Sequence, residues 1–149
     1  MHKTDDAVVF NDLLDWAPPD AFTSDPAQRD AGKWFVERGV CGSSSGIRIS
    51  SSKAQAPPEL SFDPKLRGWH DVRVRVYHPM QRDGYAVFAG TSRDRCLRML
   101  RPELSTEDFE TLSLGPRDMT GATMRLAAPW VNCYIDSVEF VPCPAAAAL

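Results

Sequence analysis

Histidine and cysteine, which supply much of the acid–base and nucleophilic chemistry of proteins, are few and widely spaced in this chain. His70 and His78 flank an alternating segment, and an extended strand would hold them about 26 Å apart, too far to share a metal ion or a proton. The four cysteines are Cys41, Cys96, Cys133 and Cys143. Their spacing contains no CxxC or CxxH pattern, so no zinc site is predicted. No triad that contains histidine can be composed from neighbouring segments.

The acidic residues could instead form the carboxylate pair of a glycosidase. Glu107, Asp108 and Glu110 stand close together, and so do Asp12 and Asp15. Such an enzyme needs two carboxyl groups on either side of the glycosidic bond. Solvated loop acids are the simpler interpretation, because most of the 20 acidic residues must lie at the surface. We therefore expect that the protein is not an enzyme, and we predict no catalytic residue and no cofactor.

Four arginines follow one another between residues 93 and 101 and are interleaved with apolar residues. They are Arg93, Arg95, Arg98 and Arg101. One interpretation is that they grip an anionic sugar, such as a uronate or a sulfated glycan, by bidentate pairing. The other is that they form the solvent face of an edge strand, where charge prevents the association of sheets. We favour the edge strand.

The composition predicts one ordinary globular domain. The chain has 149 residues, of which 43% are hydrophobic and 25% are charged, and this length is sufficient to bury a core. The net charge of -3 is not the excess of positive charge that is typical of proteins that bind nucleic acid or an anionic membrane. No apolar run is long enough to span a bilayer, so we expect neither nucleic acid nor membrane as a partner. We expect a single domain over residues 1–144 and a vector-derived tail over residues 145–149.

The clearest structural signal is the segment of residues 68–79, which must position whatever chemistry the chain has. Val72, Val74 and Val76 alternate with charged or aromatic residues. A period of two places the valines on one face and the polar residues on the other, as in a strand with one buried side. Glycine at the start and proline at the end punctuate this strand.

Shorter alternating segments surround this strand. They lie near residues 8–10, 34–36, 47–49, 60–62, 84–90, 96–100, 109–114, 124–126 and 131–140. With little helix and frequent turn signals, they predict an all-β fold, an antiparallel two-sheet sandwich of jelly-roll topology. The polar loop that ends in Asp83 and Gly84 predicts a hairpin between its two flanking strands. Ile135 and Val138 fall on opposite parities, which predicts a β-bulge near residues 136–137.

Two segments carry a resemblance to a known superfamily. Residues 68–74 (GWHDVRV) resemble the central strand of galactose-binding-like jelly rolls, and residues 134–142 (YIDSVEFVP) resemble their closing strand. Residues 118–121, followed by a strand, are similar to the penultimate hairpin of the same superfamily. Many carbohydrate-binding modules share this fold, so the resemblance implies an eight-stranded jelly roll that binds a glycan and is often attached to a catalytic domain.

Modules of that superfamily commonly begin with a Glu-rich strand that helps to hold a structural calcium ion. Here Asn11, Asp12 and Asp15 stand in that part of the chain instead. The departure from the pattern puts the calcium in doubt, and we predict no metal site.

Sugar binding needs a flat aromatic face for the CH-rich side of a pyranose and polar groups for its hydroxyls. Trp130 precedes the closing strand and Asn132 follows two residues later. In the families that the chain resembles, an aromatic residue and an asparagine near the last strand contribute to the ligand cleft. Further candidates by residue type and expected loop position are Trp34, Tyr85 and Arg93. The alternative for each is a place in the core or at its rim, because tryptophan is highly buried on average.

The sequence thus predicts a non-catalytic carbohydrate-binding module in which loop aromatics and polar groups hold the glycan. The alternative is a structural or protein-interaction sandwich without a small-molecule ligand, which would serve as an accessory domain or form a homo-oligomer. An exposed aromatic residue in a concave patch favours the glycan, whereas an apolar convex patch favours a protein partner.

Overall fold

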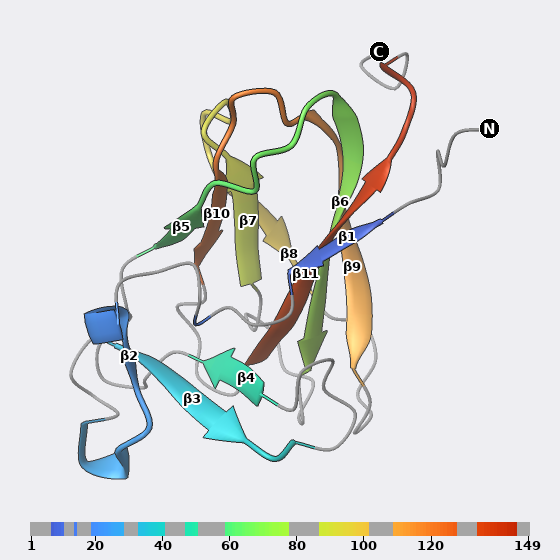
Figure 1. Ribbon diagram of the computed structural model, residues 1–149. Helices are drawn as coiled ribbons and strands as arrows, with labels where there is room; N and C mark the ends of the chain where they lie inside the picture. Colours follow the sequence, from blue (N-terminus) through green and yellow to red (C-terminus); the bar gives the residue numbers. More distant parts are fainter. Residues whose placement is uncertain are drawn as a thin grey trace.

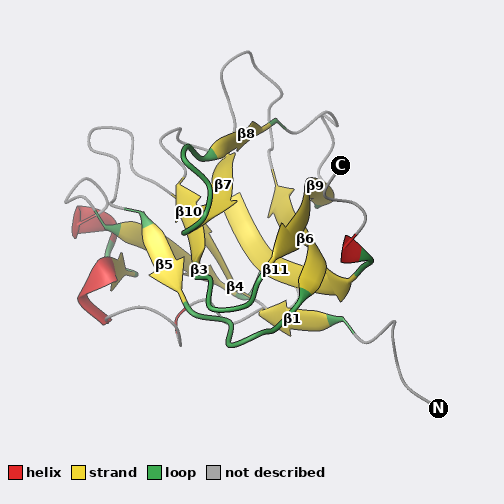
Figure 2. Ribbon diagram, turned by 90° about the horizontal axis from the view of Figure 1, so that it is seen from above, coloured by secondary structure: helices red, strands yellow, loops and turns green. Residues whose placement is uncertain are grey.

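The computed structural model describes residues 7–10, 14, 19–28, 33–40, 47–50, 59–77, 87–101, 109–127 and 134–145. These residues form eleven β-strands and two 3-10 turns, Pro19–Ala21 and Pro26–Gln28. The strands make two sheets that face each other across one core (Figures 1 and 2). Within the described ranges, no helix is long and apolar enough to cross a membrane.

The larger sheet contains seven of the described strands. They are β1 (Val8–Phe10), β2 (Phe22–Thr23), β3 (Trp34–Arg38), β4 (Ile47–Ser50), β6 (Trp69–Tyr77), β9 (Glu110–Asp118) and β11 (Tyr134–Pro142). Their order is β2-β3-β4-β11-β6-β9, and β1 also pairs with β11. Only β2 and β3, among the described pairs, run parallel. The short strands β4 and β1 pair with different parts of β11, at its start and near its end.

The smaller sheet contains β5 (Leu60–Phe62), β7 (Val87–Thr91), β8 (Arg98–Leu100) and β10 (Met124–Ala127). Its order is β5-β10-β7-β8, and its described pairs are all antiparallel. From β4 to β11, the chain changes sheet at every connection except that between β7 and β8. This alternation between layers confirms the predicted all-β sandwich with a jelly-roll path.

The hairpin predicted around residues 83–84 is wrong, because β6 and β7 lie in different sheets. The turn at residues 118–121 likewise joins β9 to β10 across the sandwich and does not close a hairpin. Alternating polarity and an Asp-Gly pair look the same in sequence whether the next strand pairs with the previous one or crosses over to the other layer. The local signal therefore located both turns but could not assign the strands to sheets.

The predicted valine face of β6 is confirmed. Val72, Val74 and Val76 are 0% exposed, whereas the residues between them are half-buried on the outer side of the larger sheet. They pack against residues of both sheets in a core whose fully buried members include Trp34, Ile49, Leu114, Met119, Met124, Leu126, Ile135, Val138 and Phe140. Burial of this apolar surface is the main term that holds the two layers together.

The predicted bulge in the last strand is also confirmed. The register of β11 against β6 shifts between Ile135 and Ser137. The extra residue is Asp136, and the shift allows Ile135 and Val138 to point into the same core although they differ in parity. Asp136 itself is 0% exposed, and its Oδ2 atom accepts a hydrogen bond from Nη1 of Arg75 at 2.8 Å.

A second bulge lies in β9, which runs further than the pattern of residues 109–114 predicted. The register of β9 shifts at Leu114, beside Gly115, whose φ is 96°. Pro116 is tolerated because β9 is an edge strand, where a missing N–H interrupts no ladder on the open side. The carbonyl of Leu114 accepts a hydrogen bond from Nη1 of Arg98 at 3.1 Å, so β8 is tied to β9 across the sheet edges.

The edge-strand interpretation of the basic run is confirmed for Arg98, whereas Arg93 and Arg95 lie in the connection before β8. β8 ends the order of the smaller sheet, and Arg98 and Met99 are exposed on it. Arg101 follows directly after this strand and is also exposed. Arg98 also bonds to β9, so its charge lies where the edges of the two sheets meet.

Candidate functional site

The structure describes two of the five predicted ligand-binding residues. Tyr85, Trp130 and Asn132 lie outside the described residues. Trp34 is 0% exposed and belongs to the core. It begins β3 instead of lying in a loop, and it shares the inward parity of Val36. Its indole presents no surface to a ligand, so Trp34 leaves the candidate set.

Arg93 is exposed in the connection between β7 and β8. Its Nη1 atom lies 3.1 Å from Oδ2 of Asp118, and its Nη2 atom donates to the carbonyl of Thr120. Asp118 pairs with Trp69 at the start of β6, whereas Tyr134, at the start of β11, pairs with Tyr77 at the end of β6. Arg93 therefore lies at the opposite end of the sandwich from the start of β11.

Three aromatic side chains gather at the other end of the larger sheet. Tyr77 ends β6 and is paired with Tyr134, which begins β11. Their rings are stacked with centroids 5.9 Å apart, and the ring of Phe109 lies 5.3 Å from that of Tyr77. Because Val76 and Ile135 point into the core, the alternation of the strands directs Tyr77 and Tyr134 to the outer face.

Arg48 of β4 lies over two of these rings. Its Cζ atom is 3.9 Å from the ring centroid of Tyr134 and 5.1 Å from that of Tyr77. Its Nη2 atom is 3.0 Å from Oε2 of Glu37 on the neighbouring strand. The Nε atom of Arg48 is buried and has no hydrogen-bond partner among the described residues. Cation–π contact and the ion pair together fix this guanidinium against the aromatic pair.

Arg75 of β6 lies over the third ring. Its Cζ atom is 4.6 Å from the centroid of Phe109, and its Nη1 atom is 2.8 Å from the buried carboxylate of Asp136. The β11 bulge thus holds Arg75 in place. We call Arg48, Arg75, Tyr77, Phe109 and Tyr134 the aromatic–arginine cluster.

Sequence reasoning missed this cluster, although one signal for it was present. Tyr77 continues the outward parity of Arg73 and Arg75, which places an aromatic side chain on the polar face of β6. The pairing of Tyr77 with Tyr134 and the approach of Arg48 join strands that are far apart in the chain. No local spacing could have revealed these contacts.

The end of β6 and the start of β11, which carry Tyr77 and Tyr134, lie at the same end of the larger sheet (Figure 1). Residues 78–86, which include Tyr85, follow directly on Tyr77. Trp130 and Asn132 stand four and two positions before Tyr134 in the sequence. Three of the five predicted site residues therefore belong to segments that begin or end at this cluster.

A cleft of about 180 Å³ adjoins the cluster on the outer face of the larger sheet. Four strands line it, with the side chains of Val9, Arg73, Arg75, Thr111, Ser137 and Glu139. We call it the outer-face cleft. A more open cleft of about 520 Å³ lies at the opposite end, between the loop that precedes β6 and the turn after β9, and includes Lys65, Arg67 and Thr120.

The described residues contain no group of three or more His, Cys, Asp or Glu side chains that could hold a metal ion. The carboxylate of Asp136 has the Arg75 guanidinium against it. Asp12 lies outside the described residues.

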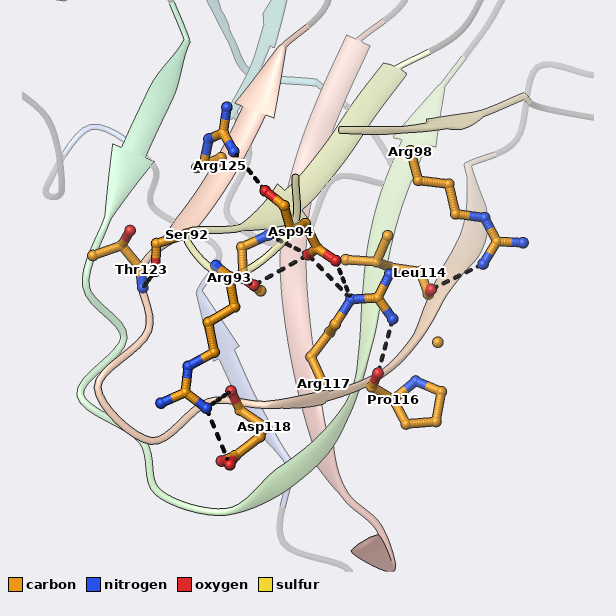
Figure 3. A network of polar contacts seen from close by, with 12 residues as sticks. Ser92, Arg93, Asp94, Arg98, Leu114, Pro116, Arg117, Asp118, Thr123 and Arg125 are labelled. Atoms are coloured by element: carbon orange, nitrogen blue, oxygen red, sulfur yellow. Dashed lines mark hydrogen bonds and ion pairs between the residues drawn. The ribbon is translucent and has the colours of Figure 1, made fainter. Parts of the chain in front are cut away.

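A second polar network fixes the end of the sandwich opposite the cluster (Figure 3). Oδ2 of Asp94 accepts hydrogen bonds from the backbone N–H of Thr91 at 2.7 Å and from Nε of Arg117 at 3.1 Å. Arg117 belongs to β9 of the larger sheet, and Asp94 lies in the connection between β7 and β8 of the smaller one. Arg125 of β10 forms an ion pair with Glu59 at 2.9 Å and donates to the Asp94 carbonyl at 3.4 Å. This network links the layers, so we assign it to the scaffold.

We expect Asp94→Asn to reduce the loss of stability in acid. Burial alone raises the pKa of Asp94, but the Thr91 hydrogen bond and the Arg117 guanidinium outweigh it and lower the pKa below its ordinary value of 3.8. Because the pKa is lower in the folded protein than in the unfolded chain, the ionised carboxylate stabilises the fold above about pH 3.8. This stabilisation is lost as the pH falls through the pKa of the folded state. Urea unfolding at pH 7 and at pH 2.5 measures the free energy of unfolding at each pH. The Asp94→Asn variant should be less stable than the wild type at pH 7. Its free energy of unfolding should also fall less than that of the wild type between pH 7 and pH 2.5.

The matched control for this experiment is Asp20→Asn, which changes an exposed carboxylate outside the network. It should keep the wild-type dependence on pH. If Asp94→Asn and Asp20→Asn behave alike, the Asp94 network does not contribute to acid lability.

Comparison with known proteins supports the fold. No protein-family model matches the chain, and no curated protein matches it. Among solved structures, the chain is similar to the crystal structure of Podospora anserina GH26-CBM35 β-(1,4)-mannanase, with a TM-score of 0.65 and 12% sequence identity. The alignment covers 94% of this chain and 28% of the mannanase chain. At this identity the similarity establishes the fold: the protein is an all-β sandwich similar to part of that mannanase chain.

Proposed function

We propose that the protein is a non-catalytic carbohydrate-binding module that holds its glycan at the end of the sandwich where the aromatic–arginine cluster lies. The observation that carries the proposal is the structural similarity to the mannanase. Nearly the whole chain aligns with 28% of a protein whose description joins a glycoside hydrolase family to a carbohydrate-binding module. A fraction of that size fits an accessory module better than a complete enzyme.

The chemistry of this end supports the proposal. Loops on a rigid scaffold commonly carry binding residues, and the segments that contain Tyr85, Trp130 and Asn132 adjoin the cluster in sequence. Trp130 would supply the flat face for a pyranose ring, and Asn132 would bond its hydroxyls. The stacked pair of Tyr77 and Tyr134 would serve as a fixed support for these loops. Arg93 lies at the other end of the sandwich and has no part in this site.

Binding to a broad glycan array, followed by titration calorimetry of each hit, tests the proposal. Trp130→Ala should weaken binding of a hit by about 30-fold, as expected for an aromatic hot spot worth about 2 kcal/mol. Arg93→Ala is the matched control, because it changes an exposed candidate at the opposite end, and it should leave the affinity unchanged. A wild-type protein that binds no glycan on the array would refute the proposal and favour the protein-interaction alternative.

A further inference from the structure

The outer-face cleft presents hydrogen-bond donors and acceptors from three adjacent strands, β6, β9 and β11. The side chains of Arg73 and Arg75 donate, the carboxylate of Glu139 accepts, and the exposed hydroxyl of Thr111 can do both. Val9 of β1, which is 45% exposed, adds an apolar wall. An array of donors and acceptors beside an apolar surface matches the hydroxyls and CH groups of a sugar.

The charges around this cleft are balanced within the protein. Nε of Arg73 lies 2.9 Å from Oδ2 of Asp71, and its Nη1 atom lies 3.7 Å from Oε1 of Glu139. Arg75 is paired with Asp136 at 2.8 Å. Both guanidinium groups that line the cleft are therefore already paired with carboxylates among the described residues. An anionic ligand would meet no uncompensated positive charge here, whereas a neutral polyol needs none.

The cleft is continuous with the aromatic–arginine cluster through Arg75, which lines the cleft and also lies over the ring of Phe109. Tyr77 of the cluster and Arg73 of the cleft are four residues apart on the same face of β6, a distance of about 13 Å along a strand. A ligand held near Tyr77 can therefore reach Arg73 only if it is longer than a single sugar unit.

From these observations we propose that the outer-face cleft is an extended subsite that binds the chain of a neutral, linear oligosaccharide. The subsite rests on the proposed function, because the loop end would hold the first units of the same ligand. Short ligands engage the loop end alone. Longer ligands continue along β6, exchange hydrogen bonds with Arg73, Glu139 and Thr111, and place CH groups against Val9. Acidic glycans are disfavoured because both guanidinium groups are already paired with carboxylates of the protein.

The experiment compares ligands of different length and charge by titration calorimetry. The probes are β-1,4-linked manno- and cello-oligosaccharides of two and six units and a galacturonate oligomer of six units. We expect the neutral hexamer that binds to do so at least about tenfold more tightly than its dimer, which corresponds to about 1.4 kcal/mol. The galacturonate oligomer should bind more weakly than the neutral hexamer.

Two variants locate the subsite. Arg73→Ala removes one wall of the cleft, and Thr111→Ile replaces an exposed hydroxyl without disturbing an ion pair while keeping a β-branched side chain. Each should weaken hexamer binding by about tenfold and leave dimer binding unchanged. Arg95→Ala, at an exposed position beside the smaller sheet, is the matched control and should change neither. Thermal unfolding of each variant verifies that it is folded.

The outcomes separate this subsite from the proposed function. If the dimer and the hexamer bind with equal affinity, and neither variant changes that affinity, the proposal of an outer-face subsite is wrong. The proposed site at the loop end would then still stand. Tighter binding of galacturonate than of the neutral hexamer would overturn its preference for neutral glycans. Binding of no glycan at all would refute both proposals together.

Discussion

Replacing Phe140 by alanine is expected to lower the free energy of unfolding by about 3–5 kcal/mol, the usual cost of removing a buried phenylalanine. Phe140 is 0% exposed in β11. Its ring centroid lies 5.5 Å from that of Phe10 in β1 and 6.4 Å from that of Phe62 in β5. The side chain therefore connects strands of both sheets, and the cavity left by alanine would open between the layers. Such a loss is a large fraction of the 5–15 kcal/mol that stabilises a typical domain.

Urea unfolding followed by tryptophan fluorescence measures this effect. The matched control is Phe88→Ala, because Phe88 is half-buried in β7 and its side chain is outside the core cluster. It should cost clearly less than Phe140→Ala. Equal losses for the two variants, or a loss below about 1 kcal/mol at Phe140, would contradict a single core shared by the two sheets.

Replacing Arg75 by methionine is expected to destabilise the protein by an amount near the lower end of the roughly 3–5 kcal/mol that accompanies the breaking of a buried ion pair. The side chain of Asp136 is 0% exposed and that of Arg75 is 32% exposed. Methionine preserves much of the packing volume but removes the guanidinium that faces the carboxylate. The partial exposure of Arg75 places the cost at the lower end of the range, because solvent already screens this charge.

A double-mutant cycle isolates the pair. Asp136→Asn removes the negative charge and keeps the shape of the side chain, so the double variant with Arg75→Met should recover part of the stability lost by Arg75→Met alone. Urea unfolding of the wild type, the two single variants and the double variant gives the coupling energy. If the two single costs simply add, the bulge at Asp136 does not hold Arg75 through its charge.

The sequence predicted well which residues are buried in strands where apolar and polar residues alternate. The valine face of β6 follows from alternation alone, and the slip of parity between Ile135 and Val138 located the bulge that buries Asp136. Trp34 shows where residue type misled: an aromatic side chain suggested a binding role, but its shared parity with Val36 places it in the core.

Contacts between distant strands could not be predicted in the same way. The approach of Arg48 to Tyr134 joins β4 to β11, and the ion pair of Arg75 with Asp136 joins β6 to β11. Both depend on the order of strands in the larger sheet. That order cannot be obtained from local patterns, because a turn that reverses the chain also serves to cross between layers, as it does between β6 and β7.

The two proposals differ in what they require of the glycan. The loop-end site depends on an aromatic face at Trp130 and applies to short and long ligands alike. The outer-face cleft depends on length and neutrality, because its arginines are already paired with Asp71, Glu139 and Asp136. Affinity that rises with chain length and falls with added carboxylates would therefore support the cleft in particular.

The most direct test of the central claim, that glycan binds at the aromatic–arginine end of the larger sheet, is a nuclear magnetic resonance titration of the isotope-labelled protein with a neutral oligosaccharide. Amide shifts should concentrate at the end of β6 and the start of β11, around Tyr77 and Tyr134, and extend to Thr111 for longer ligands. Absence of any shift, or shifts confined to the smaller sheet around Arg98, would contradict the claim.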